Sequence, residues 1–200
     1  MRWLDDLRAD YQRYPGSGLS RLKLALQCQG VWAVATFRVG QGVYALPAPL
    51  KLIALLLYLP FAKFVECLSG IQLPPGTTVG PGLYIGHFGG IIVSSHAILG
   101  ARCNLSQGVT IGASTRHGKR GAPRLGDRVY VAAGAKVFGP IAVGADVAIG
   151  ANAVVNSDVP AGVTVAGIPA QVVSRRGSAG LIELEAGAPA ELAIAAAENA

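Results

Sequence analysis

The chain has 200 residues, a formal net charge of +6 and three cysteines. This length suits one domain, or one domain with an accessory segment. The cysteines, at positions 28, 67 and 103, are too few and too scattered for a disulfide framework or a zinc site. The basic residues lack interleaved aromatic side chains and a known reader motif, which argues against a nucleic-acid partner.

Residues 1–70 are predicted to form a helical, hydrophobic region that serves oligomerisation or membrane association. Met1–Pro15 has the pattern of a short amphipathic helix followed by a turn, and Leu19–Ala45 is a second helical stretch. Pro47 and Pro49 interrupt that stretch. The charged and polar start does not have the pattern of a cleavable signal peptide, so we expect the catalytic part in the cytoplasm.

Leu50–Leu68 is the most hydrophobic stretch of the chain. Its uninterrupted apolar run, Leu52–Ala62, has eleven residues and contains Pro60, whereas a bilayer span takes about 20 residues. Two interpretations stay open. The stretch is a buried helix that packs on the rest of the protein or on another subunit. Alternatively, it dips into one leaflet at the inner face of the cytoplasmic membrane, with Lys51 and Lys63 at the headgroups.

Residues 71–176 are organised around a repeat of six, clearest between Leu125 and Pro160. The first position of each six is always aliphatic: Leu125, Val131, Val137, Val143, Ile149 and Val155. The fifth position is apolar throughout, and small residues fill the turns between. A period of six fits a parallel β-helix, in which three sixes make one triangular coil and first-position side chains fill the interior.

The same register extends upstream, with two irregular steps. First positions are expected at Leu73, Val79, Ile85 and Ile91, then after a step of eight at Leu99, and then at Leu105 and Ile111. The next first position is Leu125, so eight extra residues leave the coil within Ala113–Arg124. A long excursion from a regular scaffold often carries function.

The excursion is basic, which favours an anionic ligand such as a phosphate-bearing cofactor or a sugar nucleotide; a solvated loop is the alternative. Val163–Val173 breaks the repeat and is expected to cap the open end of the coil. Residues 177–200, rich in Ala and Glu, are predicted to be a flexible tail.

The motifs now define a resemblance. Gly86-His87 followed by GGIIV, then SQGVTIG, GAKVFG and AGIPA, resembles the hexapeptide-repeat acyltransferases. The likeness is to serine O-acetyltransferases and, more closely, to related O-acetyltransferases of exopolysaccharide and capsule clusters. It implies a mainly β fold, a left-handed parallel β-helix with an N-terminal helical region. It also implies a homotrimer with acetyl-CoA between neighbouring β-helices; in serine acetyltransferases trimers pair into hexamers.

The resemblance assigns His87 as the general base that takes the proton of an attacking hydroxyl, a role that suits histidine. Gln72 stands where serine acetyltransferases have a supporting aspartate. Gly86 replaces an acidic residue, and Ala122 replaces a second histidine tied to the serine substrate. The partner that orients His87 is left open between Gln72, a backbone carbonyl and His96.

Small residues are expected to line the acetyl-CoA site. Ala133 and Ala151 are third in their sixes and one coil apart, so they should stack on one edge. Ala113 is expected on the same edge one coil earlier, at the root of the excursion. The resemblance also suggests Arg175 and Arg176 as partners of the 3′-phosphate of the cofactor.

These features favour an acetyl-CoA-dependent O-acetyltransferase that acts on a sugar hydroxyl in exopolysaccharide or capsule biosynthesis, with a glycan or lipid-linked acceptor. The predicted acceptor-binding residues are His96, Arg116, His117, Lys119 and Arg120. The alternatives are a serine O-acetyltransferase of cysteine biosynthesis and a non-catalytic β-helix scaffold. No metal is predicted, because the three histidines show no spacing that would converge on zinc.

Overall fold

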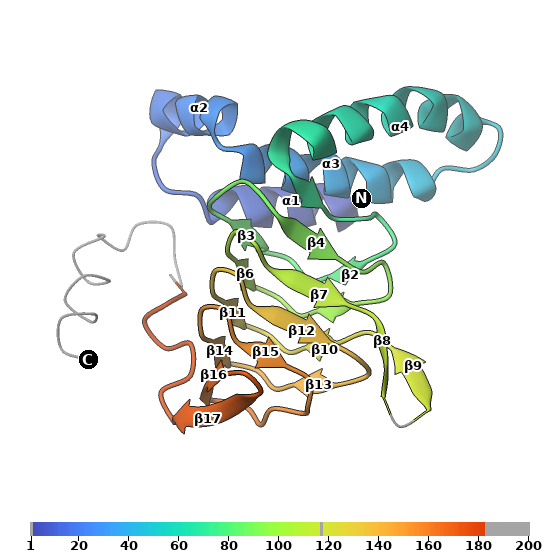
Figure 1. The fold of residues 1–200 in the computed structure, drawn as a ribbon. Helices are drawn as coiled ribbons and strands as arrows, with labels where there is room; N and C mark the ends of the chain where they lie inside the picture. The colour runs from blue at the N-terminus through green and yellow to red at the C-terminus, as the bar shows by residue number, and fades with distance from the viewer. Residues whose placement is uncertain (1, 117, 183–200) are drawn as a thin grey trace.

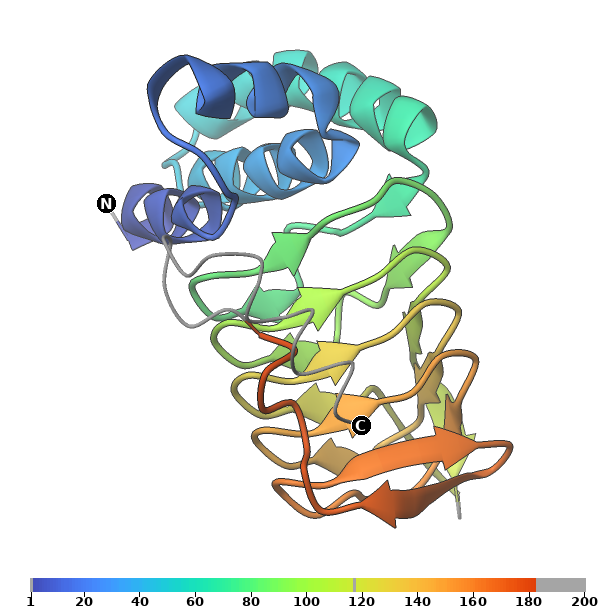
Figure 2. The ribbon, with the colours of Figure 1, turned by 90° about the vertical axis from the view of Figure 1, so that its left-hand side faces the viewer.

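The computed structural model describes residues 2–116 and 118–182. Their backbone forms a triangular β-helical prism, one end of which is covered by four helices (Figure 1). The helices are α1 (Arg2–Gln12), α2 (Gly18–Gln27), α3 (Gln29–Tyr44) and α4 (Leu50–Ser69). Figure 2 shows α2 and α4 as the layer farthest from the prism, with α1 and α3 closer to its first coil.

Each of the three prism faces is a sheet of short parallel strands. The first face holds β1 (Ile71–Gln72), β4 (Ile91–Val93), β7 (Thr110–Gly112), β12 (Lys136–Phe138) and β15 (Val154–Val155). The second face holds β2 (Thr78–Val79), β5 (Ile98–Leu99), β10 (Arg124–Leu125) and β13 (Ala142–Val143). The third face holds β3 (Tyr84–Ile85), β6 (Asn104–Leu105), β11 (Tyr130–Val131), β14 (Ala148–Ile149), β16 (Thr164–Gly167) and β17 (Ala170–Ser174).

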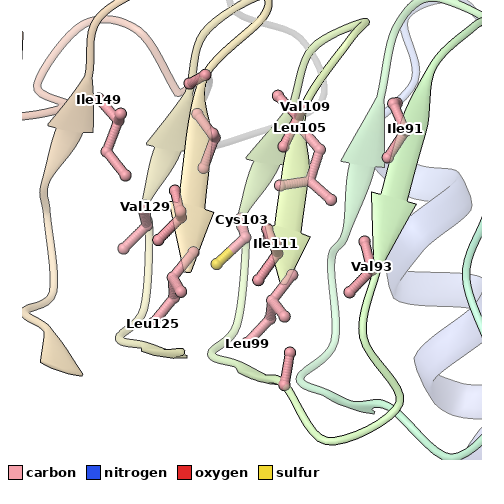
Figure 3. Close-up of a cluster of buried hydrophobic side chains, with 14 of the residues drawn as sticks. Ile91, Val93, Leu99, Cys103, Leu105, Val109, Ile111, Leu125, Val129 and Ile149 are labelled. Carbon is pink, nitrogen blue, oxygen red and sulfur yellow. The ribbon is translucent and has the colours of Figure 1, made fainter. Parts of the chain in front are cut away.

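The aliphatic side chains predicted for the interior do lie there, as Figure 3 shows for residues such as Leu99, Leu105 and Ile111, with Cys103 among them. Val131, Val137 and Ile149 are fully buried, and the other first-position residues from Leu125 onward are at most 3% exposed. Fifth-position residues such as Val129 and Ala135 are buried with them. Each coil therefore buries its apolar side chains against the coil before and the coil after, which is the main stabilisation available to so thin a fold.

The predicted register is wrong at one coil. Val93 pairs with Ile111, and Ile71 pairs with Ile91, so the first position is Val93 and Ile91 takes a fifth position. The step of eight therefore runs from Ile85 to Val93, not from Ile91 to Leu99. Ile91 and Val93 are both buried aliphatic residues, so the side-chain pattern alone fitted either register. The two extra residues lie in the turn that contains His87.

The open end of the prism is closed as expected. β17 folds back antiparallel on β16, so the last coil ends in a hairpin whose tip carries Ile168 and Pro169. The chain then turns back along the prism, where the Ser178 amide donates to the Asp146 carbonyl at 3.0 Å and the Ser178 hydroxyl donates to the Arg128 carbonyl at 2.6 Å. The predicted tail thus begins with a packed segment, while residues 183–200 lie outside the described residues.

A buried ion pair joins the helical cap to the first coil. Arg38 of α3 is fully buried, and its Nε donates to the Asp10 carboxylate of α1 at 2.7 Å. Further guanidinium hydrogen bonds go to the carbonyls of Val79 and Gly80. Asp10 in turn accepts from the amides of Gly82 and Leu83 at 2.7 and 2.8 Å. One hydrogen-bonded network therefore joins α1, α3 and the turn at residues 79–83 of the first coil. In this network each of these donors has an acceptor.

The hydrophobic stretch is one continuous helix, because α4 passes through Pro60 without ending. α4 packs on α3 and buries Tyr58, Val65 and Ser69, but most of its large apolar side chains are exposed. Within one chain α4 is therefore not buried, and both burial against another subunit and contact with one leaflet stay predictions. Within the described residues α4 is the one helix long and apolar enough to cross a membrane, and 17% of its apolar window is buried.

We expect Arg38→Ala to lower the free energy of unfolding by about 3–5 kcal/mol, because it leaves the Asp10 carboxylate buried without a cation. Asp10→Ala should cost less, because Arg38 keeps Asp6 as an ion-pair partner at 3.5 Å. Urea unfolding followed by circular dichroism measures this. The matched control is Asp5→Ala, since the Asp5–Arg8 pair on the same helix is exposed and should contribute little. Losses in the double variant that equal the sum of the single losses would contradict direct coupling between Arg38 and Asp10.

Candidate functional site

His87 lies on the prism edge that joins the third face to the first, called the His87 edge below. The turns at 86–90, 106–109, 132–135 and 150–153 stack along this edge. Backbone hydrogen bonds of 2.9 Å tie each turn to the next: Gly108 N–H to Gly89 O, Gly134 N–H to Gln107 O, and Asn152 N–H to Ala133 O. The edge is therefore a continuous ladder of turns with His87 in its first rung.

The turn that carries His87 stands out from this ladder because it holds the two extra residues. His87 and Phe88 are exposed. Gly90 has a φ of 67°, and a Cβ there would come within 3.3 Å of the Gly108 Cα. Glycine thus lets the longer turn return tightly to the ladder while His87 stays in solvent.

The helical cap fixes this turn from the other side. The Gly89 amide donates to the Ser69 carbonyl at 2.8 Å. Gly70, the left-handed residue that ends α4, packs against Gly89. The Tyr14 hydroxyl donates to the Ile85 carbonyl at 3.1 Å, and burial raises the pKa of Tyr14, so its phenol keeps the proton that this bond needs. The helical cap therefore holds the backbone on both sides of His87.

The predicted donor residues fall in three different places. Ala133 and Ala151 lie one coil apart on the His87 edge, as predicted. Ala113 follows β7 on the edge between the first and second faces, so its predicted place is wrong: it is two sixes, not three, before Ala133, and Gln107 occupies that rung. Arg175 and Arg176 are exposed and follow β17, at the opposite border of the third face from Ala151.

The excursion is an antiparallel hairpin of β8 (Ser114–Arg116) and β9 (Lys119–Gly121) that projects from the prism (Figure 1). It leaves from the edge between the first and second faces, called the hairpin edge below. Lys119 and Arg120 are exposed on it; His117 lies outside the described residues, and of Arg116 only the backbone in β8 is described.

His96 also lies on the hairpin edge, in the coil next to Ala122, where Ile98 N–H donates to Pro123 O at 3.1 Å. Its Nδ1 is 3.3 Å from the Ser95 hydroxyl. The strands of the first face run from the His87 edge to the hairpin edge, so one chain holds His87 and the hairpin cations at opposite borders of that face. The structure of one chain therefore does not bring all the predicted residues together.

Gln72 has a partner that sequence reasoning missed. It lies on β1 and is exposed, and its amide is 3.5 Å from a carboxylate oxygen of Glu66 on α4. Glu66 also accepts from Lys63 at 2.9 Å. As the single acid in the hydrophobic stretch, Glu66 could have been noticed from the sequence, but its approach to Gln72 depends on the packing of α4. No group of three or more His, Cys, Asp and Glu that could hold a metal occurs in the described part of the chain.

Comparison with known proteins decides the family. No protein-family model matches the chain. Serine acetyltransferase from Mycobacterium tuberculosis is 36% identical over 170 residues, which are 85% of this chain and 71% of that protein. Serine acetyltransferase from Helicobacter pylori is 43% identical over 114 residues, 57% of this chain and 67% of that protein. The chain belongs to the serine acetyltransferase family.

Solved structures agree. Serine acetyltransferase from Neisseria gonorrhoeae has a TM-score of 0.67 at 29% identity and covers 86% of this chain and 66% of its own. A serine acetyltransferase in complex with CoA has a TM-score of 0.69 at 27% identity, with 86% and 69% covered. The chain thus spans about two thirds of the length of these relatives. The predictions of a left-handed β-helix, an O-acetyltransferase and acetyl-CoA as donor are confirmed at the level of the family.

The prediction of an acceptor in exopolysaccharide or capsule biosynthesis is wrong. The relatives found at 32–43% identity are named serine acetyltransferases, and the closer likeness to capsule enzymes has no support among them. That prediction rested on Gln72, Gly86 and Ala122, where the chain departs from the serine acetyltransferase pattern. The prediction gave these three positions more weight than the similarity of the whole chain. The three positions bear on how an acceptor is held more than on the family to which the enzyme belongs.

The role of the His87 edge in donor binding stays a prediction, and Ala151 tests it. Ala151→Leu adds bulk on an exposed rung, so we expect about tenfold weaker CoA binding, equivalent to ~1.4 kcal/mol. Isothermal titration calorimetry with CoA measures the change. Ala161→Leu is the matched control, because Ala161 is an exposed turn residue on the edge between the second and third faces. Equal weakening by both variants would remove the His87 edge from the donor site.

Proposed function

We propose that the protein is a serine O-acetyltransferase that moves an acetyl group from acetyl-CoA to the hydroxyl of L-serine. The observation that carries this proposal is the exposed His87 at the head of an edge of small residues, in a chain 36% identical to a serine acetyltransferase. An exposed histidine held by fixed backbone, next to a row of turns narrow enough for an extended cofactor arm, suits base-assisted acyl transfer.

In this proposal His87 accepts the serine hydroxyl proton as the oxygen attacks the thioester carbonyl. A C–O bond forms, the C–S bond breaks, and the departing thiolate takes up the proton from the imidazolium. The products are O-acetylserine and CoA. General-base assistance of this kind contributes typically 10²–10⁴-fold to the rate. The Ser69–Gly89 hydrogen bond supports the reaction by keeping the His87 turn in place.

A homotrimer completes the site in this proposal. One chain holds His87 at one border of its first face and the basic hairpin at the other border. When prisms pack side by side around a threefold axis parallel to their length, the His87 edge of one chain meets the hairpin edge of the next. Lys119 and Arg120 of the neighbour then supply positive charge for the carboxylate of serine.

The departures from the family pattern bear on serine affinity. An aspartate and a second histidine of that pattern are replaced by Gln72 and Ala122, and the acid that contacts Gln72 is Glu66 of α4. A neutral amide attracts an ammonium group less than a carboxylate does. We therefore infer a weaker hold on serine than the family pattern would give.

The decisive test is turnover with acetyl-CoA and L-serine, followed by release of the CoA thiol. We expect His87→Ala to lower kcat by about 10²–10⁴-fold with little change in the Kd for CoA. Val173→Ala is the control, because Val173 is exposed near the end of β17, at the border of the third face away from the His87 edge. Wild-type kcat in His87→Ala would exclude His87 as the base. A wild-type chain that binds CoA but releases no thiol with serine would exclude serine as the acceptor.

A mixing experiment tests whether the site lies between chains. His87→Ala and Lys119→Ala/Arg120→Ala should each be inactive alone. When the two are unfolded together and refolded as mixed trimers, about one seam in four combines an intact His87 with an intact neighbouring hairpin, so we expect roughly a quarter of wild-type activity. A site built within one chain predicts no recovery at all, and that result would contradict the shared site.

A further inference from the structure

The outer helical face is a large apolar surface that the family's reaction does not use. It consists of side chains of α2 and α4 that are each more than half exposed: Leu19, Leu22, Leu26, Leu50, Leu52, Ile53, Leu56, Leu57, Leu59, Phe61, Phe64 and Leu68. Figures 1 and 2 show both helices at the end of the molecule that lies opposite the closing hairpin of the prism. A large exposed apolar patch on a protein marks a site that binds another protein, a membrane or a ligand.

The shape of this surface favours a deformable partner over a flat protein surface. At 100° per residue, the exposed apolar side chains of α4 cover an arc of roughly 200°. The remaining arc holds Tyr58, Val65 and Ser69, which pack on the protein. A flat protein surface covers a stripe of about 100° on a helix and would leave much of this arc in water. Acyl chains can surround an embedded helix on three sides.

The charge of the outer helical face favours an anionic partner and argues against a second copy of the chain. Lys23 and Lys63 are exposed and Lys51 is half-buried. α2 contains no acid, and the acid of α4, Glu66, is paired with Lys63 at 2.9 Å. A second copy of this face would offer Lys23 and Lys51 no acid, because the acid of α4 already pairs with Lys63. An anionic surface would pair with Lys23 and Lys51.

The connections of α4 distinguish lying on a bilayer from crossing it. α4 packs along α3, and its last turn is tied to the His87 turn through Ser69 and Gly70. Both ends of α4 therefore belong to one folded body on the same side of the helix. A crossing would have to pull α3 and the first coil into hydrocarbon, with the buried Arg38–Asp10 pair among them.

We propose that the outer helical face binds the surface of an anionic lipid bilayer, with α4 lying in the interfacial plane. The leucine and phenylalanine side chains enter the acyl region, Lys23 and Lys51 reach the headgroups along their apolar stems, and Lys63 stays paired with Glu66. The prism then stands away from the membrane, with His87 close to it at the first coil. The function proposed above neither requires this surface nor depends on it.

Vesicle flotation of the full-length protein tests the proposal. We expect the wild type to float with vesicles of phosphatidylglycerol and phosphatidylethanolamine, and at least tenfold less with phosphatidylcholine alone. Leu56→Glu/Leu57→Glu should reduce flotation more than tenfold without loss of thermal stability, because both side chains are about 70% exposed. Ile168→Glu is the matched control at the far end of the prism, where Ile168 is 75% exposed, and should float as the wild type does.

A second measurement leaves the apolar face intact. Cys67 is exposed on α4 within the apolar arc, whereas Cys103 is buried, so an environment-sensitive fluorophore can be attached there after Cys28→Ser. We expect a blue shift when anionic vesicles are added and its reversal at high salt. No flotation and no blue shift with anionic vesicles would overturn the proposal. So would a stable assembly in which the fluorophore is already shielded without lipid, since a second copy would then cover the face.

Discussion

The structure depends on the stacking of aliphatic side chains along the axis of the prism. Each coil has strands of only two or three residues and cannot bury its own apolar surface, so Val131, Val137 and Ile149 are buried by the coils on either side. This constraint makes the scaffold rigid and leaves variation to the edges. Residues can be added at a turn without moving the interior, but they cannot be added within a strand.

Both departures from the regular repeat are additions of that kind, and both carry candidate functional groups. Two extra residues lengthen the turn of His87, and a hairpin lengthens the turn after β7. They lie at opposite borders of the first face, so side-by-side packing of identical chains is the simplest way to unite them. The same repetition that stabilises the prism also presents a flat face and two specialised edges to a neighbour.

The sequence was sufficient for what depends on periodicity. The interior ladder, the excursion within 113–124 and the pairing of Ala133 with Ala151 on one edge were all predictable from spacing. Errors arose where spacing was ambiguous. Ile91 and Val93 are both aliphatic and buried, so the extra residues were assigned one six too late. Ala113 was placed by its position within a six, without counting the sixes of a coil.

Contacts made by packing could not be read from the sequence. Nothing in the spacing of Glu66 and Gln72 shows that α4 brings them together, and no pattern marks Arg38 as a fully buried cation. The acceptor was misjudged for a related reason. Ala122 and Gln72 show which groups are missing from the family pattern, but a pattern of absences does not name the molecule that binds in their place.

The helical cap links the two surfaces that face other molecules. Asp10 and Arg38 fix α1 and α3 to the first coil, α4 packs on α3, and the last turn of α4 holds Gly89 beside His87. The end of α4 is therefore tied to the His87 turn and the strand after it by the Gly89–Ser69 and Ile91–Gly70 backbone hydrogen bonds and by one glycine contact. In a trimer with its axis along the prisms, three outer helical faces would point the same way, so weak binding by each would add. Residues that fix the base in place would then also fix the distance of the active site from a bilayer.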